Sequence, residues 1–181
     1  MEWFDIVDEN GLPTGKTVER EEAHARGIRH RTAHVWLLRR REGRLQILLQ
    51  KRSEEKDSFP GCYDISSAGH IPAGVDFIPS ALRELEEELG VTAQAEDLHL
   101  CGRRTIHYEA IFHNKPFVDE QISNVYILWL DKEPEEFTLQ EEEVTEVRWF
   151  DFDACRCAVA EGTMPNCIEM EELDMLQKAA E

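Results

Sequence analysis

The sequence has no run of about 18 consecutive apolar residues, the length that a helix needs to cross a membrane. Its first residues, Met1 to Asp5, contain neither a basic segment nor an apolar stretch, so they do not look like a secretory signal peptide. We therefore expect a cytoplasmic protein without a membrane segment. The five cysteines form no Cys-x-x-Cys pair, which disfavours a structural zinc site and predicts free, mostly buried thiols.

Basic residues are also scarce. The chain has 20 lysines and arginines against 38 aspartates and glutamates, and its formal net charge is −18. Such a surface repels the phosphates of nucleic acids, so a nucleic-acid partner is not expected. The same charge would repel a small anionic substrate, unless a bound divalent cation reverses the local field.

Strand-like and helical segments follow one another without a linker or an internal repeat, which predicts one mixed α/β domain over residues 1–181. A hairpin is expected over residues 2–18, a short polar helix over 19–26, and a polar loop over 53–61. The other expected strands are 33–38, 45–50, 63–67, 98–101, 105–112, 121–130 and 144–150. The other expected helices are 76–89, 153–160 and 168–180.

The segment 76–89 has the strongest helix signals. Asp76 is suited to cap its start, and Gly90 follows its expected end. Three leucines, Leu82, Leu85 and Leu89, recur at a spacing that forms one apolar face.

The same segment carries Glu84, Glu87 and Glu88, spaced so that their carboxylates share one face of the helix. Their mutual repulsion and their place near the negative end of the helix dipole each cost from a few tenths to about 1 kcal/mol. Clustered carboxylates are the ligands that Mg²⁺ takes in proteins. Taken alone, the three glutamates are equally consistent with a solvated acidic face, because the whole chain is rich in glutamate.

The surrounding residues favour the metal site. The segment resembles the Nudix box: a glycine, five residues, a glutamate, seven residues, then Arg-Glu-apolar-x-Glu-Glu-x-Gly-apolar. The matching residues are Gly69, Arg83, Glu84, Leu85, Glu87, Glu88, Gly90 and Val91. Val75 departs from the pattern, because the family usually has its first glutamate there, and Asp76 is the neighbouring carboxylate available to replace it. We expect Val75 to weaken the anchoring of the loop and to leave the metal ligands in place.

The resemblance implies an α/β/α sandwich with a mixed sheet and a Mg²⁺-dependent hydrolase, with Mn²⁺ as the alternative ion. Glu84, Glu87 and Glu88 would bind the metal together with the backbone carbonyl of Ala68, and Arg83 would orient the glutamates. A metal-activated water would attack a phosphorus atom of a diphosphate linkage. Glu87, Glu88 and Arg83 are thus the expected catalytic residues.

Other residues are weaker candidates. Glu120 would be the distal carboxylate that joins the metal or acts as a base, against the alternative of an ordinary glutamate at a strand edge. Lys51 and Arg52 would bind substrate phosphates, against the alternative of solvated surface charges. Three aromatic residues, Trp36, Tyr63 and Trp129, are candidates for stacking on a base but are more typical of a core.

Within the Nudix superfamily, residues 3–150 look like the branch that contains isopentenyl-diphosphate isomerase. The similarity rests on Asp8-x-x-Gly11-x-Pro13-x-Gly15, on Ala23-His24, on His30 and on Gln50-Lys51-Arg52-Ser53. The catalytic cysteine and glutamate of the isomerase correspond to Ala68 and Gln121, and neither side chain can transfer a proton as those do.

The same resemblance places His24, His30 and His70 near positions that hold a metal in the isomerase. A second metal site there is one expectation, and three unconnected histidines are the other. His34 is expected to point from its strand into the core or the pocket.

The favoured function is hydrolysis of a small-molecule diphosphate, either a nucleoside diphosphate derivative or an isoprenyl diphosphate. The alternatives are a catalytically silent Nudix domain used for binding or regulation, and an isomerase-like enzyme. The resemblance also favours a homodimer.

Overall fold

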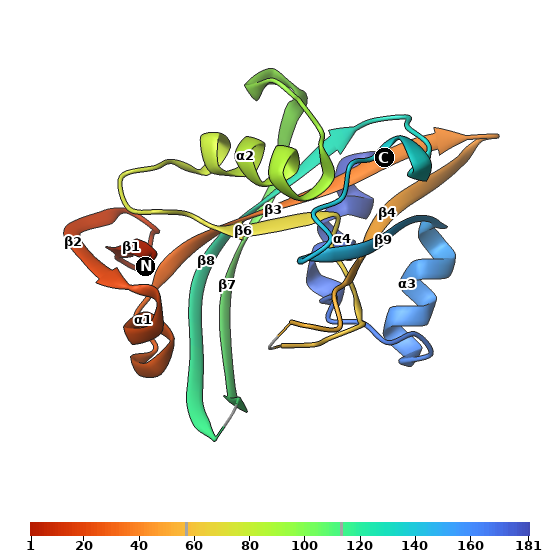
Figure 1. The fold of residues 1–181 in the computed structure, drawn as a ribbon. Coiled ribbons are helices and arrows are strands. Elements are labelled where there is room, and N and C mark those ends of the chain that lie inside the picture. The colour runs from red at the N-terminus through yellow and green to blue at the C-terminus, as the bar shows by residue number, and fades with distance from the viewer. Residues whose placement is uncertain (57, 113) are drawn as a thin grey trace.

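The computed structural model describes residues 1–56, 58–112 and 114–181; Asp57, in the loop expected over 53–61, and His113 lie outside the described residues. The chain begins with β1 (Trp3–Val7), β2 (Pro13–Glu19) and α1 (Arg20–Arg26) (Figure 1). The next elements are β3 (His30–Arg41), β4 (Arg44–Arg52), β5 (Tyr63–Asp64), β6 (Ser67–His70), α2 (Phe77–Leu89) and the short 3-10 helix η1 (Ala95–Asp97). The last are β7 (Leu98–Phe112), β8 (Lys115–Trp129), η2 (Pro134–Glu136), β9 (Val144–Asp151), α3 (Phe152–Glu161) and α4 (Met170–Ala180).

Seven strands form a mixed sheet in which β5, β4, β3, β8 and β7 are neighbours in that order. β3 and β8 run parallel, and the other pairs are antiparallel. The edge of β3 opposite β8 has two partners: its last residues pair with β4, and its first residues pair with β6. The sheet therefore splits between β4 and β6.

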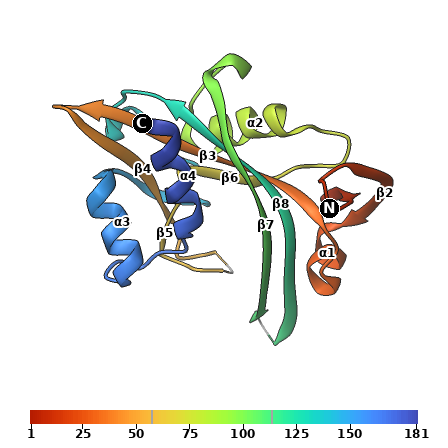
Figure 2. The ribbon, with the colours of Figure 1, turned by 180° about the vertical axis from the view of Figure 1, so that it is seen from behind.

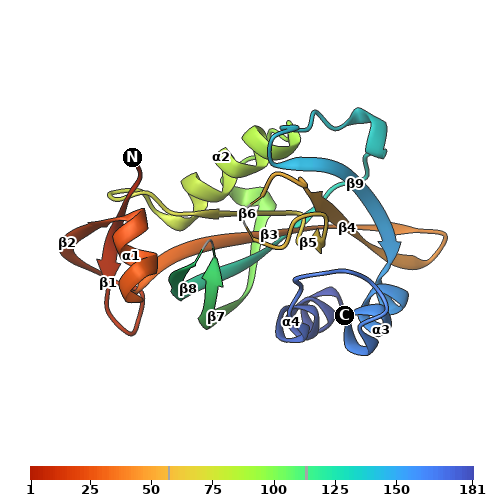
Figure 3. The same ribbon diagram turned by 60° about the horizontal axis from the view of Figure 1, so that its bottom comes forward.

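Helices cover both faces of this sheet, as the sequence predicted. α2 packs on one face, and α3 and α4 pack on the other (Figure 2 and Figure 3). Successive side chains of β3 alternate between the two layers: Val35 and Leu37 belong to the core beneath α2, whereas Trp36 and Leu38 belong to the core against α3 and α4. The fold is an α/β/α sandwich with a mixed sheet.

The helix signals of α2 are confirmed. Asp76 caps the helix by accepting a hydrogen bond from the amide of Phe77 at 2.7 Å, and Gly90 ends it with a left-handed backbone, φ 63°. Leu85 and Leu89 are fully buried beneath the helix. The caps set the ends of α2, whereas its buried leucine face sets its rotation about the axis and so decides where the glutamates point.

Two strand predictions are wrong in detail. The strand expected over 63–67 is divided into β5 and β6, because Ser66 lies where β3 and β4 diverge. Its hydroxyl accepts a hydrogen bond from the amide of Leu37 at 2.8 Å and donates one to the carbonyl of Leu48 at 2.6 Å. The strands expected over 98–101 and 105–112 are the single strand β7, which pairs with β8 along its length and accommodates Cys101 as a shift of register between Leu100 and Gly102.

The first three elements form a small unit of their own at one end of the sheet (Figure 1). β1 and β2 make the predicted hairpin, and Phe4, Val18 and Ala23 form its buried cluster. No helix within residues 1–56, 58–112 and 114–181 is long and apolar enough to cross a membrane. The five cysteines are free, but only Cys155 is buried, so the prediction of mostly buried thiols is wrong.

Candidate active site

A cavity of about 1820 Å³ opens where the sheet splits. Most of the residues that line it come from α1, β3, β4, β6, α2, β7, β8 and α4, and from the loop between β4 and β5. Glu84, Glu87, Glu88 and Ala68 are all among them, so the predicted metal ligands lie on one wall of one cavity.

Two glutamates of α2, Glu84 and Glu88, pack directly against β6. Glu88 is only 7% exposed, and Ser67 donates a hydrogen bond to its Oε2 at 2.7 Å. A Cβ atom built on Gly69 would lie 2.4 Å from the Cδ atom of Glu84, far closer than a real contact. The glycine that opens the predicted motif is therefore required because a carboxylate stands against its backbone.

Burial makes this wall electrostatically unfavourable without a cation. Burial, together with the charge of Glu84, raises the pKa of Glu88 to about 8, although the hydrogen bond from Ser67 opposes the shift. Burial also raises the pKa of Glu84, although Arg83 opposes the shift. Clustered, partly buried carboxylate oxygens are the donor set of a hard divalent cation, so the wall fits Mg²⁺.

Arg83 contacts two of the glutamates. It donates to Oε1 of Glu84 at 2.6 Å, and its Nε lies 3.8 Å from Oε2 of Glu87. The arginine thus lies closest to its neighbour in sequence, and its contact with Glu87 is the looser of the two.

Val75 stands in a loop that is anchored in another way. Arg31 donates to the carbonyl of Val75 at 2.8 Å and to Oδ2 of Asp5 at 3.1 Å, and the same Asp5 oxygen accepts from the amide of Gly74 at 2.9 Å. Asp76 does not replace the missing glutamate, since its side chain is 81% exposed. The N-terminal hairpin and β3 thus hold the loop through its backbone.

Three further candidates lie apart from the glutamates. Glu120 does not line the cavity but accepts from Arg29 at 3.2 Å and pairs with His107 at 2.7 Å. Arg52 lines the cavity but is held by Asp64 at 3.0 Å and by the carbonyl of Ser58 at 3.0 Å. Lys51 is half-buried and is not part of the lining.

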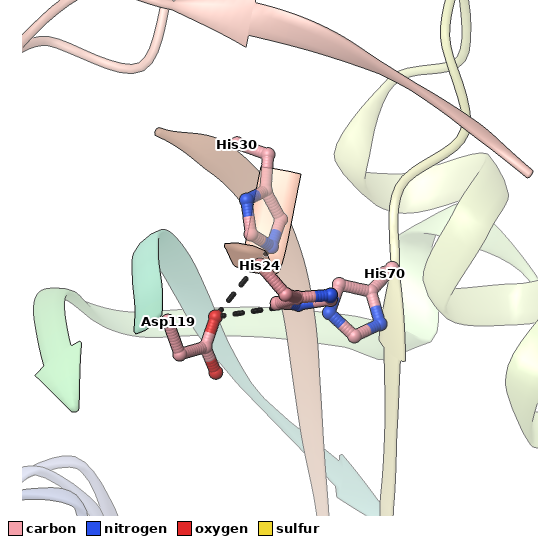
Figure 4. Close-up of side chains that lie close together, drawn as sticks. All are labelled: His24, His30, His70 and Asp119. Carbon is pink, nitrogen blue, oxygen red and sulfur yellow. Dashed lines mark ion pairs between the residues drawn. The ribbon is translucent and has the colours of Figure 1, made fainter. Parts of the chain in front are cut away.

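The three histidines come together with an aspartate. One potential ligand atom from each of His24, His30, His70 and Asp119 lies within 4.8 Å of the others (Figure 4). The Nε2 atoms of His24 and His30 each lie 3.6 Å from Oδ1 of Asp119. These three atoms are buried and have no hydrogen-bond partner among the described residues. Buried polar atoms without partners indicate an ion that the cluster would bind.

The protonation of the cluster suits a metal. His30 donates from Nδ1 to the carbonyl of Ile28 at 2.8 Å, which leaves the lone pair of Nε2 facing the cluster. Burial, followed by the charge of His30, lowers the pKa of His24 to about 4, and burial also lowers the pKa of His30 and of His70. Neutral imidazoles and one carboxylate are a donor set that transition metals favour over Mg²⁺.

Asp119 was missed by sequence reasoning, although a signal was present. Successive side chains of a strand point to opposite faces, so a site that includes Gln121 should include Asp119 and exclude Glu120. The structure follows this alternation: Gln121 donates to Oδ2 of Asp119 at 2.6 Å.

A buried ion-pair network lies on the face of β3 toward α4. Glu172 is 2% exposed and accepts hydrogen bonds from His34 at 2.8 Å, from Trp36 at 2.7 Å and from Arg104 at 2.7 Å. Burial would raise the pKa of Glu172, but His34 and Arg104 lower it to about 2. His34 was expected to point into either the core or the pocket, and its side chain lines the cavity.

The comparisons with known proteins agree with this geometry. The family model for the NUDIX domain matches residues 28–167. The chain belongs to the Nudix family. It is 41% identical over 157 residues to Nudix hydrolase 3 of Arabidopsis thaliana, which covers 86% of this chain and 20% of that protein. An uncharacterized Nudix hydrolase of Clostridium acetobutylicum is 38% identical over 143 residues, covering 79% of this chain and 66% of that protein.

The chain thus spans about one fifth of the length of the Arabidopsis protein and about two thirds of the Clostridium one. Two solved structures share the fold. DR0079 of Deinococcus radiodurans superposes with a TM-score of 0.67 at 19% identity, over 96% of this chain and 98% of that one. The NUDIX domain of Shewanella oneidensis NrtR, solved with ADP ribose, gives a TM-score of 0.60 at 15% identity, over 83% and 88% of the two chains.

Proposed function

We propose that this Nudix protein is a Mg²⁺-dependent hydrolase that cleaves a diphosphate linkage in a small metabolite. The observation that carries the proposal is the set of three carboxylates, Glu84, Glu87 and Glu88, on the wall of one cavity, with Glu84 against Gly69 and Glu88 bound to Ser67. The named relatives are Nudix hydrolases, and the NrtR domain binds a diphosphate-linked compound, ADP ribose. The substrate is therefore sought among diphosphates, with Mn²⁺ as the alternative ion.

We assign each residue of the site a role from the groups that surround it. Glu84, Glu87 and Glu88 would hold the ion with the backbone carbonyl of Ala68, and Arg83 would fix the carboxylate of Glu84. Bound Mg²⁺ supplies charge neutralisation at the phosphates and a more acidic water. Ser67 holds Glu88 in one orientation. We propose no catalytic part for Glu120, because its carboxylate is bound to Arg29 and His107.

We further propose that His24, His30, His70 and Asp119 bind a second, transition-metal ion. The support is the set of buried ring nitrogens and the carboxylate oxygen that have no partner within the described chain. Zn²⁺ is the probe of choice, because imidazole nitrogen binds it well. The site joins α1 to β3, β6 and β8, so the ion would also tie the N-terminal unit to the sheet.

The hydrolase is tested by release of phosphate or pyrophosphate from a panel of nucleotide and isoprenoid diphosphates with Mg²⁺. Glu87→Gln and Glu88→Gln should each abolish most of the turnover while the melting temperature falls little. Glu86→Gln is the matched control, because Glu86 lies on the same helix, is exposed and does not line the cavity. Equal activity in Glu86→Gln, Glu87→Gln and Glu88→Gln would refute the assignment.

A silent binding domain is the remaining alternative. Metal binding at the glutamates without cleavage of any diphosphate would favour it. An isomerase is disfavoured because Gln121 is hydrogen-bonded to Asp119 and Ala68 carries no ionisable group. Proton exchange at a carbon atom of isopentenyl diphosphate would instead support the isomerase function.

A further inference from the structure

The loop that joins β6 to α2 has almost no polar side chain of its own. Its residues, 71–76, are Ile-Pro-Ala-Gly-Val-Asp, and the side chain of the one carboxylate among them, Asp76, is 81% exposed. Yet this loop connects the two elements of the proposed magnesium site, because β6 carries Ala68 and Gly69 and α2 carries the glutamates. The loop must therefore be held in place by groups outside it.

Asp5 of β1 and Arg31 of β3 supply the side-chain attachments. The Nη2 atom of Arg31 donates to the carbonyl of Val75 at 2.8 Å and to Oδ2 of Asp5 at 3.1 Å. The same Oδ2 atom accepts from the amide of Gly74 at 2.9 Å. One guanidinium nitrogen and one carboxylate oxygen thus hold two consecutive residues of the loop.

The backbone of β1 continues this line of contacts. The amide of Ala73 donates to the carbonyl of Trp3 at 2.8 Å, and Phe4 forms an isolated antiparallel bridge with Pro72. Phe4 is fully buried in the cluster of the N-terminal unit, so β1 is itself fixed. The loop is therefore attached to a rigid neighbour.

The pair of Asp5 and Arg31 is buried. Arg31 is 5% exposed, and the side chain of Asp5 is 12% exposed. The other carboxylate near the guanidinium, that of Asp76, lies 3.7 Å from Nη1 and is largely in solvent. A buried charge needs a partner that is also withdrawn from water, and Asp5 meets that requirement. Hydrogen bonds between charged groups in such surroundings are strong, so the pair fixes its geometry.

The guanidinium of Arg31 also contacts the start of α2. Its Cζ atom lies 5.3 Å from the ring centroid of Phe77, which is the first residue of the helix. Continuous backbone hydrogen bonds make a helix move as one body, so a shift of its first turn also moves the carboxylates farther along it. Glu84 has little room for such a shift, because it stands directly against Gly69.

We propose that Asp5 and Arg31 are positioning residues of the magnesium site: they hold the loop so that Ala68 and the glutamates of α2 meet at one ion. This inference rests on the proposed function. It gives β1 a part in metal binding, although none of its five described residues lines the cavity. The loop contributes only backbone groups to these contacts, so the anchor can be removed only by changing Asp5 or Arg31.

The test uses the opposite charges of the two residues. Binding of Mn²⁺ without substrate is measured by electron paramagnetic resonance in wild type, Asp5→Ala and Arg31→Met. Glu88→Gln identifies the part of the binding that belongs to the glutamates. A purely electrostatic effect would weaken Mn²⁺ binding in Asp5→Ala and tighten it in Arg31→Met. Loss of the anchor should weaken Mn²⁺ binding in both.

Asp8→Ala is the matched control for damage to the N-terminal hairpin. Oδ1 of Asp8 accepts from the amides of Asn10 and Leu12, so this variant weakens the turn of the same hairpin and leaves the contacts of the loop in place. Arg31→Lys is the conservative variant, because a single nitrogen makes both contacts of Arg31. Melting temperatures are measured first, and Asp5→Asn replaces Asp5→Ala if the alanine variant does not fold.

Asp5→Ala and Arg31→Met should each bind Mn²⁺ about 10-fold more weakly, the low end for residues that support metal ligands from behind. Both should also need about 10-fold more Mg²⁺ for half-maximal turnover. Arg31→Lys and Asp8→Ala should stay close to wild type in both measurements. Wild-type Mn²⁺ affinity in the folded Asp5 variant, tighter binding in Arg31→Met, or an equal loss in Asp8→Ala would overturn the proposal.

Failure of the anchor can be distinguished from failure of the hydrolase. Weaker Mn²⁺ binding in Asp5→Ala and Arg31→Met, without cleavage of any diphosphate by wild type, would leave the anchor standing and refute the hydrolase. Diphosphate hydrolysis with the same Mg²⁺ dependence and the same Mn²⁺ affinity in wild type and both variants would do the reverse.

Discussion

Replacing Gly69 by alanine should abolish most of the proposed hydrolase activity while the fold survives. A Cβ atom at Gly69 would lie 2.4 Å from both Cγ and Cδ of Glu84, and ordinary contacts begin at 3.4 Å, so the carboxylate must move by about 1 Å. Gly69 lies in β6 and has no positive φ, so its backbone accepts alanine. The clash therefore acts on Glu84 and leaves the backbone unstrained.

The magnitude follows from that displacement. A misplacement of about 1 Å at a catalytic group typically costs about 100-fold in rate. The atoms that must give way belong to a flexible side chain, so the cost in the free energy of unfolding should be about 1 kcal/mol, at the low end for overpacking. The expected result is thus a kcat reduced by about two orders of magnitude.

Gly74→Ala is the matched control. Gly74 lies in the loop between β6 and α2, and its added Cβ would meet nothing within 4 Å, although its φ of 78° makes alanine unfavourable there. Mg²⁺-dependent phosphate release and chemical denaturation are measured for both variants. Gly74→Ala should lose stability and keep most of its turnover, whereas Gly69→Ala should do the opposite. Full turnover in Gly69→Ala would refute the placement of Glu84 against β6.

Three further outcomes are expected from the buried charges. Glu172→Gln should lower the free energy of unfolding by about 3 kcal/mol, because it removes the buried counter-charge of His34 and Arg104 and leaves Arg104 only the exposed Glu171 as a partner; a loss below about 1 kcal/mol in urea denaturation would contradict the burial of the pair. The pKa of Glu172 is lowered to about 2, so the carboxylate makes its full contribution to the free energy of unfolding above its unfolded pKa. This contribution should disappear as the pH falls from about 4.5 to 2. If the wild type were still more stable than the variant at pH 2, the carboxylate would not be the source of the difference. Zn²⁺ should raise the melting temperature of the metal-free protein, and Asp119→Asn or His24→Ala should remove most of that increase; an equal increase in all three proteins would place the ion elsewhere.

Sequence reasoning reached the fold and one wall of the site because those depend on local patterns. The spacing of Glu84, Glu87 and Glu88 and the caps at Asp76 and Gly90 lie within one helix, where a periodicity of 3.6 residues determines which side chains share a face. The mixed α/β class followed from the succession of strands and helices along the chain, and the α/β/α layers followed from the resemblance to the Nudix family. The division of residues 63–67 into two strands could not be read in this way, since it depends on where β3 and β4 diverge.

The rest of the site was decided by pairing between distant segments. His30 lies beside Gln121 only because β3 and β8 run parallel in that register, and this register brings Asp119 to the histidines. The same alternation turns Glu120 away to Arg29 and His107. Sequence alone determined the carboxylate helix; the tertiary structure decided which groups face it, because a shift of one residue in strand register exchanges the two faces of the sheet.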